Sequence, residues 1–368
     1  MFKSLSLVAL ALSVNAMAAT PAVEIQKSSI VKNYAALVEN TYSESLRTAN
    51  ILKSDVENFL NNPGVVTMEV AKESWKKARA PYGTSEAFRF YNGPIDRDGG
   101  PEGLLNSWPL DEAYIDYVVG NPNAGIINDT AKYPEISKEL LESLNELDGE
   151  KNISTGYHAI EFLLWGQDLN DDGPGNRPYT DYVKGKGLNT ERRAQYLRAA
   201  TTLLIENLEG LALEWAPNQD NFRREFENQD VQVSLKNIFN GIVFMAGDEL
   251  SGERMYVAYE TKGQEDEHSC FSDMTHMDIQ WNFEGINNIL VKTNLLNGVK
   301  TQNASLVAKV SAKLASTDKA LKGIPAPFDQ ALKSEEGLDA ILAGVESLEG
   351  LAADLVKLAK EYDVKIDY

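Results

Sequence analysis

The chain has 368 residues, of which 43% are hydrophobic and 24% charged, and this is the composition of a globular protein with a sizeable core. Its formal net charge of -20 excludes the basic footprint that nucleic acid binding needs, so no nucleic acid partner is expected. Its single cysteine, Cys270, excludes an internal disulfide, so the fold must rest on its core or on a bound ion.

Residues 1–18 have the pattern of a secretory signal peptide. Lys3 precedes a short apolar run, and Ala16 and Ala18 form an A-x-A cleavage signature. No cysteine lies near the cleavage point to carry a lipid, and no later run of about eighteen apolar residues could span a membrane. The mature chain is therefore expected to start near Ala19 and to reside in the periplasm or on the cell surface.

Apolar residues then recur at three- and four-residue steps almost throughout the chain, which is the helical period. The first helical stretch is predicted from Ile30 to Phe59, and the second begins at Thr67 and is ended by Pro81 to Gly83. Further helices are predicted at residues 111–119, 135–147, 154–165, 190–215, 231–259, 275–297, 304–321 and 334–362, with Asn189 as the N-cap of the helix that starts at 190. Loops are predicted at residues 91–109, 120–133 and 166–187.

No convincing strand pattern appears, so the predicted fold class is all-α. The chain is longer than one typical core, which favours two helical-bundle domains, predicted at residues 19–186 and 187–368. The loops at residues 91–109 and 166–187 exceed the usual length of helix connections, and this makes them candidates for function.

The strongest chemical signal is the spacing of His158 and Glu161. On a helix, residues three apart share one face, so an imidazole and a carboxylate at this spacing can bind one cation. A hydrogen-bonded pair without metal is the alternative. Apolar neighbours on most of the helix circumference predict that the pair is buried, where it needs a partner or a metal to offset its desolvation.

A second candidate segment, residues 264–276, contains two of the three histidines. Glu267, His268, Asp273 and His276 are ligand types suited to iron or zinc. An exposed acidic loop that caps the next helix is the alternative. Cys270 is expected to be a small apolar side chain and not a nucleophile, because acidic neighbours raise a thiol pKa.

A third segment, residues 79–96, carries Arg79, Tyr82, Glu86 and Asp96. Glu86 lies among aromatic residues and could be a third metal ligand. It could equally form a structural bridge with Arg79 or Arg89. Residues 168–173 imitate the start of a calcium loop, but position twelve is Tyr179 where a bidentate Glu is required, so an Asx-turn loop is the better interpretation.

These segments, together with residues 177–182, resemble the signature blocks of the imelysin family, and in character the iron-regulated A-type members. The resemblance implies two bundles of four-helix type with the signature helix at or near their interface, in an exported protein associated with iron. It implies a metal set of His158, Glu161, Glu86 and His268. Residues implied to support or bind the ligand are Arg79, Tyr82, Asp96, Tyr179, Asp181, Glu267, Asp273 and His276.

Three functions are consistent with these features. The favoured one is a metal-binding protein of iron uptake or homeostasis, with zinc or calcium as alternative ions and a membrane uptake component as a partner. Imelysins are also classed as metallopeptidases, which would need about three ligands, a bound water and a general base. The third is a module that binds a ligand other than a metal. Other hydrolase and nucleotide-binding motifs are missing.

Overall fold

A computed structural model describes residues 21–170 and 173–368 of the chain. The predicted signal peptide and two residues of the calcium-like loop, Asp171 and Asp172, lie outside the described residues. The long helices of the first half and the helices that flank them are α1 (Pro21–Asn61), α2 (Val65–Ser85), η1 (Glu86–Phe88), α3 (Glu102–Asn106), α4 (Glu112–Ile115), α5 (Gly125–Asn128), α6 (Lys138–Leu144), α7 (Gly156–Trp165), η2 (Tyr179–Tyr182) and α8 (Thr190–Glu214).

The remaining elements follow α8 along the chain. They are α9 (Phe222–Asn228), α10 (Val231–Phe244), the π-helical η3 (Met245–Tyr256), α11 (Val257–Thr261), η4 (Gln264–Asp266), α12 (Thr275–Lys292), η5 (Asn297–Val299), α13 (Ala304–Lys322), α14 (Phe328–Leu332) and α15 (Glu335–Lys360). Within the described ranges the only extended pairing is an isolated bridge between Val118 and Asn121. The all-α prediction is confirmed.

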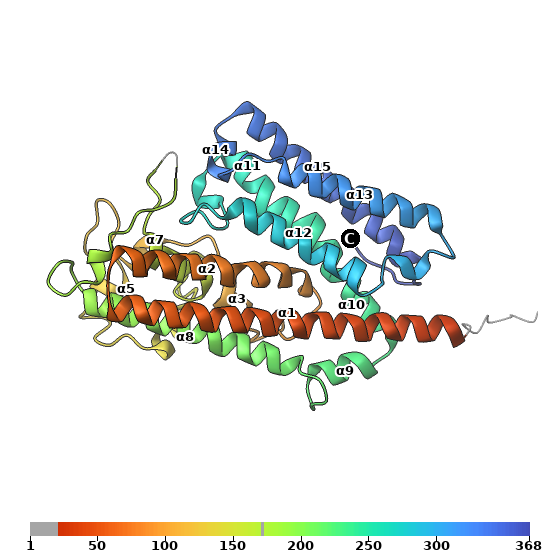
Figure 1. The fold of residues 1–368 in the computed structure, drawn as a ribbon, viewed down its shortest axis with the longest axis horizontal. Coiled ribbons are helices and arrows are strands. Elements are labelled where there is room, and N and C mark those ends of the chain that lie inside the picture. The colour runs from red at the N-terminus through yellow and green to blue at the C-terminus, as the bar shows by residue number, and fades with distance from the viewer. Residues whose placement is uncertain (1–20, 171–172) are drawn as a thin grey trace, which may run out of the picture.

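The helices form two groups that lie against each other. α1 packs on α2 and α8, and α7 packs on α2 and α8, while α10, η3 and α13 pack on α15, and α12 packs on η3 and α13 (Figure 1). α12 packs on α2 and joins the two groups. The division at residues 186 and 187 stays a prediction, but α8, which it places in the second half, packs with the helices of the first.

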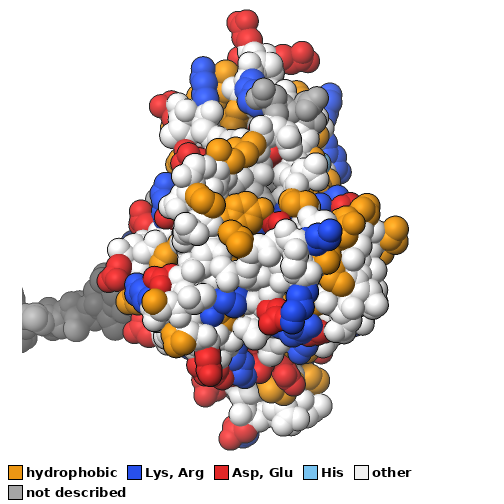
Figure 2. Space-filling view, turned by 90° about the vertical axis from the view of Figure 1, so that its left-hand side faces the viewer, with side chains coloured by type: hydrophobic (Ala, Val, Ile, Leu, Met, Phe, Trp, Pro, Cys, Tyr) orange, Lys and Arg blue, Asp and Glu red, His pale blue; other side chains and the backbone are white. Residues whose placement is uncertain are grey.

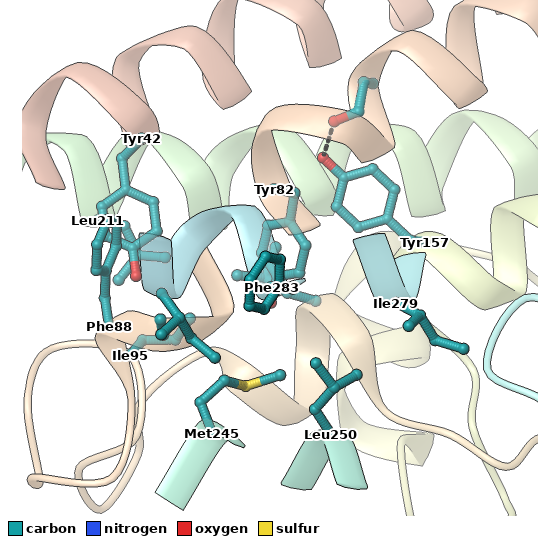
Figure 3. Close-up of a cluster of buried hydrophobic side chains, with 14 of the residues drawn as sticks. Tyr42, Tyr82, Phe88, Ile95, Tyr157, Leu211, Met245, Leu250, Ile279 and Phe283 are labelled. Atoms are coloured by element: carbon teal, nitrogen blue, oxygen red, sulfur yellow. Dashed lines mark hydrogen bonds between the residues drawn. The ribbon is translucent and has the colours of Figure 1, made fainter. Parts of the chain in front are cut away.

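One hydrophobic core runs through both groups. Tyr42 and Tyr82 come from α1 and α2, and they belong to the same buried cluster as Met245, Leu250 and Phe283 (Figure 3). Such continuity means that α2 and α12 are held by apolar burial on both sides. Within the described residues, no helix is long and apolar enough to cross a membrane.

Several predicted boundaries are wrong, and tertiary packing explains them. α2 continues through Pro81 to Ser85, because the hydroxyls of Thr84 and Ser85 donate to carbonyls of its last turn and Tyr82 is fully buried. Asn189 does precede α8, but its backbone is left-handed, and its side chain donates to Asn128 Oδ1 (2.9 Å) and not to the helix. Elements also occur in each predicted loop, namely α3, α5 and η2.

Candidate functional site

The site is built on α7, which is buried over its whole length. Gly156 starts the helix at a φ of 83°, and a Cβ atom there would lie 2.6 Å from the Leu105 carbonyl oxygen, so glycine is needed for this close approach. Trp75 Nε1 of α2 donates to the carbonyl of Tyr157 (2.9 Å), and Tyr157 donates its hydroxyl to Ala78 of α2. These contacts fix the rotation of α7 about its axis.

His158 and Glu161 lie together on one face of α7, as their spacing predicts. His158 Nδ1 is 2.9 Å from Glu161 Oε2. The other carboxylate oxygen, Oε1, accepts hydrogen bonds from the backbone N–H (2.9 Å) and hydroxyl (2.7 Å) of Ser272. His158 Nε2 is buried and has no hydrogen-bond partner within the described residues. One nitrogen of the imidazole is thus held in place, and the other is open.

Burial dominates the protonation of this pair. It raises the pKa of Glu161 to about 8, against the lowering effect of the Ser272 hydrogen bonds. It lowers the pKa of His158 well below the usual value, and the Arg79 charge lowers it further. Near neutral pH the imidazole is therefore uncharged, and Glu161 is protonated and can donate to His158 Nδ1. With Nδ1 accepting, the N–H of the neutral ring lies on Nε2, and a cation bound there would displace that proton.

His268 lies next to His158, although 110 residues separate them in sequence. Their ring centroids are 4.8 Å apart. His268 Nδ1 is 3.2 Å from Asp278 Oδ2, and Nε2 is 3.4 Å from Asn106 Nδ2. Arg79 Nη2, which can only donate, also lies 3.1 Å from Nδ1, so Nδ1 faces an acceptor and a donor while Nε2 faces donors. Burial lowers the pKa of His268, so this ring is also neutral.

Arg79 connects His268 to α12. Its guanidinium forms two contacts with the carboxylate of Asp278, at 3.0 and 3.2 Å, and lies 3.1 Å from His268 Nδ1. All three side chains are buried. Asp278, Asn106 and Ser272 were not predicted as site residues. Ser272 and Asp278 lie within or just after the segment at residues 264–276, and Asn106 lies in the predicted loop at residues 91–109, so position was their only signal.

A cavity of about 260 Å³ opens beside the two histidines. Its lining includes His158, His268, Glu267 and Cys270, with Trp108 along one wall. The Trp108 indole donates to the carbonyl of Glu267 (2.9 Å) and meets the His268 ring edge-on. Glu267 Oε1 is buried without a partner in the described part of the chain, and burial raises the pKa of its carboxyl group. Burial likewise raises the pKa of Cys270, in line with an unreactive thiol.

Glu86 lies in a different environment from the predicted metal ligands. Its Oε2 accepts from Arg254 (2.5 Å) and Arg89 (2.9 Å). Burial raises the pKa of Glu86, but Arg254 and Arg89 outweigh that effect and bring it to about 2. The structural-bridge alternative therefore describes the contacts of Glu86, with Arg254 as a partner that the sequence did not indicate. Tyr82 is buried nearby, and its hydroxyl makes no hydrogen bond to described residues.

The remaining candidates are spread over the molecule. Asp96 accepts from the backbone N–H groups of residues 90, 91 and 93 and so shapes a turn. Asp181, which follows Tyr179 in η2, accepts from Tyr117 and Arg177. Asp273 and His276 are partly exposed and do not line the cavity. Burial raises the pKa of Asp273 to about 7.

The described residues contain no group of three or more His, Cys, Asp or Glu side chains placed to hold a metal ion. His158, Glu161 and His268 come together, but Glu161 faces the Nδ1 side of His158, and both nitrogens of His268 are close to other side chains. His158 and Glu267 both line the cavity, and within the described residues His158 Nε2 and Glu267 Oε1 are buried without hydrogen-bond partners. The cavity can bind a ligand that brings some of its own coordinating or hydrogen-bonding atoms.

At the end of the molecule that lies on the left in Figure 1, the visible surface carries charged side chains of both signs. Figure 2 shows this face, where acidic and basic side chains are interspersed and hydrophobic groups gather between them. The net charge of -20 is therefore not concentrated there. We therefore base no function on long-range electrostatic attraction of cations to this face.

Known proteins are similar to this chain in sequence and in fold. The chain is 21% identical over 336 residues to the iron-regulated protein A of Synechococcus elongatus, covering 87% of this chain and 82% of that protein. Its fold is similar to a crystal structure from Parabacteroides distasonis named as an iron-regulated protein A precursor, with a TM-score of 0.75, 18% identity and coverage of 94% and 97% of the two chains.

An Imelysin-like protein from Psychrobacter arcticum also has a similar fold, with a TM-score of 0.68, 12% identity and coverage of 98% of this chain and 100% of that one. The model of the Imelysin family matches residues 38–355, a span that contains α7, the cavity and α12. The chain belongs to the Imelysin family.

Proposed function

We propose that this chain is an exported protein of iron homeostasis that binds a metal ion, with iron as the first candidate, in the cavity beside His158. The observation that carries the proposal is the state of the His158 ring. Glu161 lies 2.9 Å from Nδ1, Nε2 is buried with no hydrogen-bond partner among the described residues, and the His158 residue lines the cavity. Metal-binding histidines are commonly oriented by a carboxylate on their second nitrogen in this way.

The chemistry of the donors limits what can bind. His158 would supply a nitrogen, and Glu267 is the candidate for an oxygen, because its Oε1 also has no hydrogen-bond partner in the part of the chain that the structure describes. Imidazole and carboxylate together suit iron and zinc better than calcium, which prefers an all-oxygen shell. Since few protein donors are open, water or small-molecule ligands would fill the other positions on the ion. When bound, the metal supplies a Lewis-acidic centre in the cavity.

Iron is favoured because the curated relative from Synechococcus elongatus is named as an iron-regulated protein. Export is supported by the signal-peptide pattern of residues 1–18. A membrane uptake component remains the proposed partner.

The peptidase alternative has less support from the geometry. A metal-dependent hydrolase needs a carboxylate free to act as general base toward a metal-bound water. Glu161 is engaged on one oxygen by His158 and on the other by Ser272. A binding role uses this arrangement directly, because the carboxylate then only orients the imidazole.

Calorimetric titration tests the proposal. Protein purified without chelator or affinity metal is titrated with Fe²⁺ under anaerobic conditions, with ferric citrate and with Zn²⁺, and its metal content is measured by elemental analysis. We expect one bound ion per chain and an affinity loss of at least roughly tenfold in His158→Ala. His276→Ala is the matched control, because His276 lies outside the cavity lining. Equal affinities of the wild type and His158→Ala would refute the site.

A further inference from the structure

A second concave surface lies between α12 and α13, apart from the histidine cavity. It has a volume of about 620 Å³, within the range of small-ligand sites. One wall comes from the face of α12 that carries Met277, Trp281 and Asn288, and the other from α13 near Leu314 and Asp318. The two helices pack on each other (Figure 1). None of the residues that line the histidine cavity lines this groove, so the two sites can be tested separately.

Trp281 gives the groove a fixed aromatic surface. Its side chain is partly exposed. It rests on α2 where Gly83 leaves no room for a larger residue, since a Cβ atom on Gly83 would lie 2.9 Å from Trp281 Cβ. Gly285, one helical turn further on, meets Thr84 in the same way. Because α12 is held against α2 at Trp281 and again at Gly285, the indole is pre-organised, which lowers the entropy cost of binding.

Open polar groups follow the indole along the same helix. Gln280, Glu284, Asn287 and Asn288 line the groove, and their side chains have no hydrogen bond or ion pair within the described part of the chain. From Gln280 to Asn288 the helix rises about 12 Å. The stripe therefore presents three carboxamides and one carboxylate along this length of helix.

The charge of the groove excludes several ligand classes. Among the described residues that line the groove, the one cation is Lys322, and it is paired with Asp318 at 2.8 Å. The described lining therefore has no free cation to meet a phosphate, a nucleotide or an acidic polymer. Since Glu284 is open, the groove carries at most one uncompensated negative charge. A neutral ligand with many hydroxyl groups fits this balance.

We propose that the groove between α12 and α13 binds a neutral oligosaccharide. The apolar C–H face of a pyranose ring stacks on an indole, while its hydroxyl groups lie at the ring edge. A hydroxyl both donates and accepts, and so does a carboxamide, so the amides of Gln280, Asn287 and Asn288 can pair with such hydroxyls in either direction. Trp281 acts as the stacking platform, and Glu284 accepts from a hydroxyl.

The test uses the purified chain with cellohexaose, chitohexaose and maltohexaose as probes. Tryptophan fluorescence and calorimetry are recorded up to millimolar sugar. We expect at least one of the three to bind, and its affinity to fall at least roughly tenfold in Trp281→Ala, which corresponds to about 1.4 kcal/mol. Trp281→Phe should keep part of the affinity, because it keeps an aromatic face.

Two further variants separate binding from folding. Asn287→Ala and Asn288→Ala remove open amides without touching the contact with Gly83, and each should weaken the sugar complex while the thermal unfolding curve stays unchanged. Gln219→Ala, an exposed amide outside the groove, is the matched control. The proposal is overturned if no probe binds, or if the groove variants bind the sugars as tightly as the wild type does. It is also overturned if an unstructured peptide binds in the groove and the sugars do not.

Discussion

Glu86 and Glu161 are both fully buried, yet their surroundings shift their pKa values in opposite directions. Burial raises both values, but Arg254 and Arg89 bring the pKa of Glu86 down to about 2. Glu161 meets a serine and a neutral imidazole, and its pKa rises to about 8. A buried carboxyl paired with guanidinium groups is held as a charged carboxylate, although Oε1 of Glu86 has no hydrogen-bond partner in the described part of the chain. A carboxyl surrounded by neutral donors can exchange its proton, and that property suits a binding site.

The largest effect is expected at Glu86. Glu86→Ala leaves Arg254 and Arg89 short of a buried counter-charge, so we expect a loss of about 3 to 5 kcal/mol in the free energy of unfolding. Urea unfolding followed by circular dichroism measures it. Glu44→Ala, which breaks an exposed pair with Arg47, is the control and should change stability by less than about 0.5 kcal/mol. Similar losses of stability in both variants would contradict a buried ion pair between Glu86 and the two arginines.

The next effect is the pH dependence that Glu161 gives to stability. The pKa of Glu161 is raised on folding from 4.5 to about 8. The stability that this shift contributes is therefore fully present below pH 4.5 and is lost as the pH rises through 8. Unfolding of metal-free wild type and Glu161→Gln is compared between these pH values. The difference between the two curves should fall with pH by up to about 1.4 kcal/mol per unit. Parallel curves would show that Glu161 titrates normally.

Ser272 gives the smallest expected change. Ser272→Ala removes the hydroxyl that donates to Glu161 Oε1 but keeps the backbone N–H. We therefore expect a loss of about 1 to 2 kcal/mol in the free energy of unfolding. The pKa of Glu161 should rise further, because a hydrogen bond that favours the charged form is lost. The variant therefore moves the pH profile of the preceding experiment to higher pH. Ser272→Thr, which keeps a hydroxyl, should restore the wild-type profile.

The sequence predicted the features that depend on local geometry. Helical periodicity is set by neighbours three and four residues apart, so the all-α class and most long helices could be read directly. The same geometry places His158 and Glu161 on one face of α7, whatever surrounds them. The short helices α3 and α5 escaped prediction, because their few residues become helical only when packing buries Leu105 or Ile126.

Tertiary structure alone decided which side chains meet. Arg254 lies 168 residues from Glu86 and Ser272 lies 111 residues from Glu161, and no local pattern encodes either contact. These partners determine that Glu86 is charged, whereas Glu161 is protonated near neutral pH and His158 Nε2 has no hydrogen-bond partner among the described residues. The physical reason is that burial makes a carboxyl group depend on its nearest charges and donors, and those come from segments that only the folded chain brings together.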